Sequence, residues 1–142
     1  MNAVKLVAVF AENKPGQTAH ITKILADANV NIRWVTVASS GTFGVMKFLV
    51  NDSALAYQAL KHEGYVATLV EVLAVEVPDQ PGALHDVASC LARHHINLDN
   101  SSGVVANHRA ILIIETANLT AARKVLEKHK LRLLTQTEML SL

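Results

Sequence analysis

Asn13-Lys14-Pro15-Gly16 and Asp79-Gln80-Pro81-Gly82 are two versions of one turn, and they lie 66 residues apart in a chain of 142 residues. Each turn follows a short apolar stretch and precedes a stretch in which apolar residues recur with helical spacing. A Pro-Gly pair between a strand and a helix marks a sharp change of chain direction. The same strand–turn–helix unit is therefore predicted twice.

The repeat extends over most of the chain. Identical residues at the offset of 66 are Val4/Val70, Ala8/Ala74, Val9/Val75, Pro15/Pro81, Gly16/Gly82, Leu25/Leu91, Ala26/Ala92, Asn31/Asn97, Ala56/Ala122 and Leu60/Leu126. Apolar character also recurs in register, at Ile21/Val87, Val30/Ile96, Ile32/Leu98, Val45/Ile111 and Phe48/Ile114. Self-similarity at a fixed period indicates tandem copies of one unit. We expect two domains, residues 1–70 and 71–142, with a boundary near Val70.

The first copy is predicted to run strand, helix, strand, strand, helix, strand. Ile21, Ile24 and Leu25 have the spacing of one buried helical face. Asp52 or Ser53 is expected to cap the second helix, and Gly64 to end it. The expected elements are strands at residues 4–11, 32–39, 43–50 and 65–70 and helices at residues 17–28 and 53–62.

The second copy repeats this order. Its expected elements are strands at residues 71–77, 96–102, 110–116 and 131–135 and helices at residues 83–94 and 118–129. Two right-handed βαβ crossovers place both helices on one face of a four-stranded antiparallel sheet. The predicted fold class is therefore α+β, with two tandem ferredoxin-like βαββαβ domains.

Some strands are apolar at both parities, which is typical of strands buried on both faces. The stretches are Leu6–Ala11 and Ile111–Ile114. A ferredoxin-like sheet leaves one face without helices, so the second face needs a cover. Either the two copies or a second chain could provide it, and we expect a homodimer. The polar run Asp99-Asn100-Ser101-Ser102 could line a pocket or form a solvated edge.

Composition excludes several classes of function. The chain has 13 basic and 12 acidic residues and a net charge of +1, so no strong field attracts nucleic acid or a membrane surface. Although 51% of the residues are apolar, no uninterrupted apolar run approaches the roughly 20 residues of a membrane span. Cys90 is the only cysteine, which excludes an internal disulfide and is typical of a reducing cytoplasm. A cytoplasmic protein is predicted.

The two Pro-Gly turns are the candidate binding sites. A turn of this kind aims the unpaired N–H groups of the first helical turn at the space before the helix. Glycine leaves room for a ligand, and the helix dipole favours an anion such as a small carboxylate. The simpler interpretation is that Pro-Gly only forms the turn.

The chain resembles the ACT domain family over nearly its whole length. The resemblance rests on Asn/Asp-x-Pro-Gly after a strand, on the helix that follows, and on Asn31-Ile32 and Asn97-Leu98 at the start of the next strand. It implies a regulatory, allosteric module that binds amino acids near the first loop. The implied ligand residues are Asn13, Lys14, Gly16, Gln17 and Thr18 in the first copy and Asp79, Gln80, Gly82, Ala83 and Leu84 in the second.

The paired format resembles stand-alone tandem ACT proteins and, more distantly, the regulatory subunit of acetolactate synthase. We therefore expect a non-enzymatic module that signals to a partner enzyme or regulator. The alternative is an accessory subunit of an amino-acid biosynthetic enzyme with vestigial pockets. No phosphate loop, nucleophile elbow or paired catalytic carboxylates appear, and the seven histidines lack metal-ligand spacing. We predict no catalytic residues, no metal and no cofactor.

Overall fold

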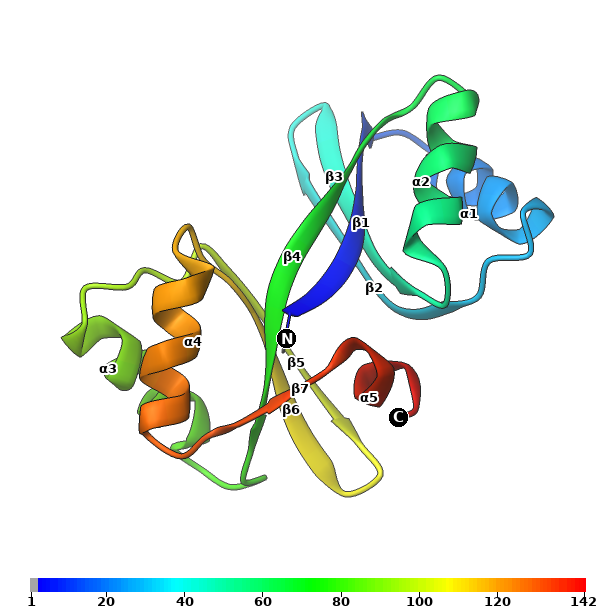
Figure 1. The fold of residues 1–142 in the computed structure, drawn as a ribbon. Coiled ribbons are helices and arrows are strands. Elements are labelled where there is room, and N and C mark those ends of the chain that lie inside the picture. Colours follow the sequence, from blue (N-terminus) through cyan, green and yellow to red (C-terminus); the bar gives the residue numbers. More distant parts are fainter. Residues whose placement is uncertain (1–2) are drawn as a thin grey trace. The chain divides into compact units, whose positions relative to one another are not determined.

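The computed structural model describes residues 3–142, which divide into two compact units. The first unit is Lys5–Val70, and the second is Glu71–Leu142, with which Ala3 and Val4 are grouped. Each unit has two helices on one face of an antiparallel sheet (Figure 1). This confirms the predicted α+β fold of tandem ferredoxin-like units.

The first unit has strand order β2-β3-β1-β4. Its elements are β1 (Ala3–Glu12), α1 (Gln17–Asp27), β2 (Ile32–Ser40), β3 (Phe43–Val50), α2 (Ser53–His62) and the first part of β4 (Val66–Val77). Asp52 caps α2 by accepting a hydrogen bond from the Leu55 amide at 3.1 Å. Gly64, with a φ of 87°, follows the helix end. The predicted bounds of these elements are correct to within one or two residues.

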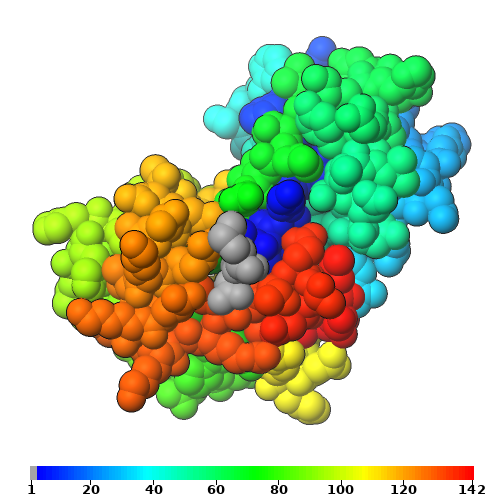
Figure 2. Space-filling view, viewed as in Figure 1, coloured from blue at the N-terminus to red at the C-terminus, as the bar shows by residue number. Residues whose placement is uncertain are grey.

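The second unit has strand order β5-β6-β4-β7. Its elements are the second part of β4, α3 (Ala83–Arg93), β5 (Asn100–Ala106), β6 (Arg109–Glu115), α4 (Leu119–Lys128), β7 (Arg132–Leu134) and α5 (Gln136–Leu140). Asn118 caps α4 through a 3.1 Å hydrogen bond from the Ala121 amide. In the space-filling view, the orange α4 and the red α5 both lie at the surface (Figure 2).

Three predictions about the elements differ from the structure. The strands expected at residues 65–70 and 71–77 form one strand, β4, because nothing between them interrupts the extended backbone. The strand expected from residue 96 begins at Asn100, and the Asn97 side chain instead donates to the Asp99 carboxylate at 2.9 Å. Such local side-chain bonds compete with a sheet ladder. This edge strand leaves most of Asn100–Ser102 exposed to solvent.

The third difference is α5, which the strand and helix patterns did not predict. The Thr135 hydroxyl accepts a 3.2 Å hydrogen bond from the Glu138 amide and so caps the helix. Thr135-Gln136-Thr137-Glu138 has the spacing of a capping box, and this was the signal available in the sequence.

Each unit has a core between its helices and its sheet. In the first unit Val7, Val9 and Phe48 from the strands meet Ile21 and Leu25 from α1. The second unit uses the repeat-related set, including Leu73, Val75, Ile114, Val87 and Leu91. Several of the pairs at the 66-residue offset, such as Ile21/Val87, Leu25/Leu91 and Phe48/Ile114, therefore lie in the two cores.

The side chains on the other face of the central strands, which point away from the helices, are also buried. Leu6 and Ala8 of β1 are 0% and 1% exposed, and Val72, Ala74 and Ile113 are at most 3% exposed. Burial at both parities explains the continuous apolar runs in these strands. Across residues 3–142, no helix has the length and apolar character that a membrane crossing requires.

The β5–β6 hairpin contains a strained turn that a substitution can relieve. Asn107 and His108 connect the paired residues Ala106 and Arg109, and both have positive φ, at 51° and 61°. Two-residue turns of this kind favour Asn-Gly, because glycine adopts positive φ without steric cost. We expect His108→Gly to raise the free energy of unfolding by about 0.5–1 kcal/mol, measured by urea denaturation. Ser101→Gly, in the adjoining strand, is the control and should lower it.

Candidate functional site

Both strand-to-helix turns place a glycine in the left-handed region. Gly16 has a φ of 87° and Gly82 a φ of 91°, and each precedes its helix without a side-chain capping bond. The first amides of an α-helix have no carbonyl partner within the helix. At Thr18 and Leu84 these donors therefore face the space before the helix. The predicted ligand residues thus lie in two separate loops, one at the start of α1 and one at the start of α3.

In the first unit the loop is held against the β2–β3 turn. The Asn13 backbone amide donates to the Thr42 carbonyl at 2.7 Å, and the Asn13 side-chain amide donates to the Gly41 carbonyl at 3.1 Å. The Lys14 ammonium lies 3.4 Å from the Glu12 carboxylate. Asn13 therefore has a structural role in the loop, and its side-chain oxygen remains available as an acceptor.

A polar cluster fixes the first residue of α1. The Gln17 side-chain amide donates to the Tyr65 hydroxyl at 2.8 Å, and His20 Nδ1 hydrogen bonds with the same hydroxyl. Neither Tyr65 nor His20 is among the ligand residues that the motif predicted. Their repeat-related positions hold Leu131 and Asp86, so the difference between the copies was the available signal.

The second site has a different chemical character. Ala83 packs against the core, Leu84 is 53% exposed, and both Asp79 and Gln80 are exposed. Asp86 lies in the first turn of α3, whereas the first turn of α1 has no acidic residue. The Asp86 carboxylate already interacts with the positive end of the α3 helix dipole, which weakens the attraction of that helix start for a further anion. An anionic group is therefore favoured at α1 over α3.

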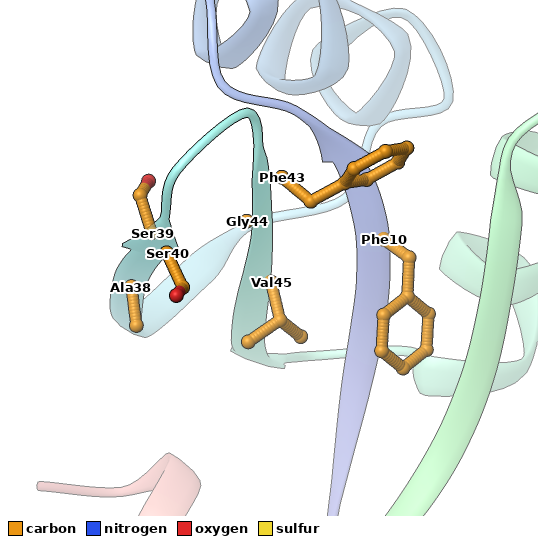
Figure 3. A pocket seen from close by; sticks show the side chains of 7 residues that line it. All are labelled: Phe10, Ala38, Ser39, Ser40, Phe43, Gly44 and Val45. Atoms are coloured by element: carbon orange, nitrogen blue, oxygen red, sulfur yellow. The ribbon is translucent and has the colours of Figure 1, made fainter.

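An apolar hollow lies at the same end of the first unit as its loop. Phe10 of β1 and Val45 of β3 are cross-strand partners, and Phe43 precedes Val45 by two residues on the same sheet face. Phe10 and Phe43 are 48% and 62% exposed, and the hollow has a volume of about 340 Å³. Figure 3 shows its lining residues, which are Phe10, Ala38, Ser39, Ser40, Phe43, Gly44 and Val45.

The second unit carries an ion-pair network at the equivalent place. Glu76 and Arg109 stand 66 residues after Phe10 and Phe43. The Arg109 guanidinium donates to both Glu76 carboxylate oxygens, at 2.8 and 3.1 Å. Arg132 donates to Glu76 and to Glu138 of α5, each at 2.8 Å. Hydrogen bonds from Arg109 and then Arg132 lower the pKa of Glu76 from 4.5 to about 2.

Within residues 3–142, no three His, Cys, Asp or Glu side chains come together as metal ligands. Cys90 is a buried free thiol. The polar groups that the structure brings to the loops are backbone amides, one carboxamide cluster and the Glu12–Lys14 pair. This arrangement is suited to holding a small charged molecule.

Two βαββαβ units with glycine-capped first helices define a tandem ferredoxin-like module. The family model described as an ACT domain pair matches residues 2–142, and the chain belongs to that family. No curated protein sequence matches the chain significantly.

Solved structures share the fold. Protein BT0572 from Bacteroides thetaiotaomicron is 28% identical, with a TM-score of 0.91 and all of both chains covered. The regulatory subunit of aspartate kinase from Thermus thermophilus is 19% identical, with a TM-score of 0.61 over 89% of this chain and 91% of that one. The subunit from Thermus flavus is 14% identical, with a TM-score of 0.59 over 87% and 90%.

The Glu76 network predicts a pH dependence of stability. Because the pKa of Glu76 is lower in the folded chain, the network stabilises the fold fully above pH 4.5, and this contribution is lost as the pH falls toward about 2. The side chains are 24–57% exposed, so we expect Glu76→Gln to lower stability at pH 7 by only about 1 kcal/mol. Urea denaturation at pH 7, 4.5 and 2.5 should show a flatter profile for the variant.

Glu127→Gln, on the exposed surface of α4, is the matched control and should keep the parent profile. Parallel pH profiles for Glu76→Gln and the parent chain would contradict the assigned role of the network.

Proposed function

We propose that this chain is a regulatory module that binds a small amino acid at its strand-to-helix loops and signals to a partner enzyme or regulator. The observation that supports it is the geometry of the two turns. In each, a left-handed glycine precedes the helix without a side-chain cap, and the amides of Thr18 and Leu84 have no carbonyl partner within the helix. These donors, together with the helix dipole, favour a carboxylate.

The expected affinity is that of a metabolite sensor. A hydrogen bond to a charged group contributes roughly 1.5–3 kcal/mol. Two or three such bonds give a dissociation constant in the millimolar to micromolar range. Family membership supports the same function, because the chain is an ACT domain pair over residues 2–142.

We propose residues 1–70 and 71–142 as the two domains of this module. The ligand residues are Asn13, Lys14, Gly16, Gln17 and Thr18 in the first and Asp79, Gln80, Gly82, Ala83 and Leu84 in the second. The absence of an acidic residue in the first turn of α1 makes the first site the stronger candidate.

We propose a metabolic enzyme as the partner and the cytoplasm as the location. Structures described as aspartate kinase regulatory subunits share the fold, and a separate catalytic chain is one arrangement consistent with it. Cys90 is buried as a free thiol, which is consistent with a reducing compartment. The accessory-subunit alternative shares this partner and differs in having no functional ligand site.

Placing a carboxylate at each helix start tests the ligand site. In Thr18→Asp and Leu84→Asp the new charge lies where the ligand carboxylate would bind. It also interacts favourably with the helix dipole. We expect an unchanged or more stable fold and at least tenfold weaker binding at the altered site. A thermal-shift screen against the twenty amino acids identifies the ligand, and calorimetry then measures the affinity of each variant.

Thr18→Asn and Leu84→Asn are the neutral controls, and they should bind nearly as the parent does. If no amino acid stabilises the parent chain, the accessory-subunit alternative is favoured. Equal binding by the parent and both Asp variants would place the ligand elsewhere.

We also propose a homodimer, and exposed edge strands are its support. β2 lies at the edge of the first sheet, where Val35 and Val37 are 47% and 52% exposed. An apolar sheet edge is a pairing surface, and a lysine on it blocks pairing. We expect light scattering to give twice the 15.3 kDa chain mass for the parent and the single-chain mass for Val37→Lys. Val66→Lys, at a 68% exposed site outside that edge, should remain dimeric.

A further inference from the structure

We propose that the apolar hollow of the first unit, together with Glu12 and Lys14, binds one amino acid with a large apolar side chain. This inference rests on the proposed amino-acid binding and adds a second place, separate from the helix starts, for an amino acid with a larger side chain. The side chain enters the hollow, Glu12 binds the ligand ammonium, and Lys14 binds the ligand carboxylate.

The hollow has the lining of an apolar side-chain pocket. Phe10, Phe43, Val45 and Ala38 contribute apolar side chains to the lining, and none of the seven lining residues is charged. Its volume of about 340 Å³ is near the lower end of the range for small-molecule sites, about 300–1,000 Å³. Large exposed aromatic side chains that line a concavity are typical of a binding surface.

Glu12 and Lys14 supply opposite charges next to this hollow. Glu12 is the cross-strand partner of Phe43 and lies two residues after Phe10, so it is on the face that carries both rings. The Lys14 ammonium is 3.4 Å from the Glu12 carboxylate, and the side chains are 57% and 64% exposed. An exposed ion pair of this kind contributes little to stability. Separating it to receive the two charged groups of a zwitterion therefore costs little.

The loop that carries Lys14 is held next to the hollow. Asn13 is bonded to Gly41 and Thr42, the two residues between Ser40 and Phe43. The backbone thus keeps the polar loop and the apolar hollow at one end of the sheet.

The second unit has the same strand register without this site. Glu76 pairs with Ile111 as Phe10 pairs with Val45, but Glu76 and Arg109 replace the two aromatic rings. Pro78 and Gln80 replace Glu12 and Lys14, so the opposite charges are also missing. One ligand per chain is therefore expected at this site.

Calorimetry on the full chain tests the site with L-phenylalanine, L-leucine, L-serine and 3-phenylpropanoate, which lacks the ammonium group. We expect the hollow to bind L-phenylalanine and L-leucine at least tenfold more tightly than L-serine, at one such site per chain. Phe43→Ser should weaken L-phenylalanine binding at least tenfold. Val105→Ser, which removes a 61% exposed apolar side chain from β5, is the control and should leave it unchanged.

Glu12→Gln tests the contact with the ligand ammonium independently of the apolar hollow. It should weaken L-phenylalanine binding at least fivefold and leave 3-phenylpropanoate binding unchanged, because only the first ligand has an ammonium. Normal L-phenylalanine binding by both Phe43→Ser and Glu12→Gln would overturn the site while leaving amino-acid binding intact. If the parent binds none of the twenty amino acids, the proposed function itself fails. A loss of the dimer in Phe43→Ser would overturn the site by assigning the hollow to a contact between chains.

Discussion

The left-handed backbone at Gly16 and Gly82 is the constraint on which both units depend. A strand that turns at once into a helix needs positive φ at this point, and glycine adopts it without strain. The turn lays α1 and α3 over one face of their sheets, where the two cores form. It also leaves the first helix amides without side-chain caps. One backbone requirement therefore produces both the fold of each unit and its candidate site.

The two units show how one backbone can carry different chemistry. At the same sheet position, the first unit exposes Phe10 and Phe43, and the second pairs Glu76 with Arg109. Arg132 connects that pair to Glu138 of α5, an element for which the first unit has no counterpart, because its last strand continues directly into the second unit. The second unit thus has ion pairs between side chains in this region, whereas the first unit has an apolar hollow there. The two copies have therefore diverged at these positions, from an apolar surface in the first unit to an ion-pair network in the second.

The sequence could predict the candidate loops but only part of their chemistry. Asn13 and Gln17 were identified from the motif, yet their side-chain partners, the Gly41 carbonyl and the Tyr65 hydroxyl, lie 28 and 48 residues away. A motif specifies residues that are near in sequence, whereas these contacts depend on how the chain folds back. The hollow was missed for the same reason, since Phe10 and Val45 become neighbours only through the β1–β3 register.

The sequence by itself determined the repeat, the order of elements and the family resemblance, because periodic apolar residues, glycines and caps act locally. The helix α5 was not predicted, although Thr135 and Glu138 have the spacing of a capping box, which hydrophobic periodicity does not reveal. Tertiary structure decided the rest. It set Phe10 across from Val45 and Glu12 across from Phe43. These neighbours depend on the pairing of strands that are far apart in the sequence, and a local sequence pattern does not specify that pairing.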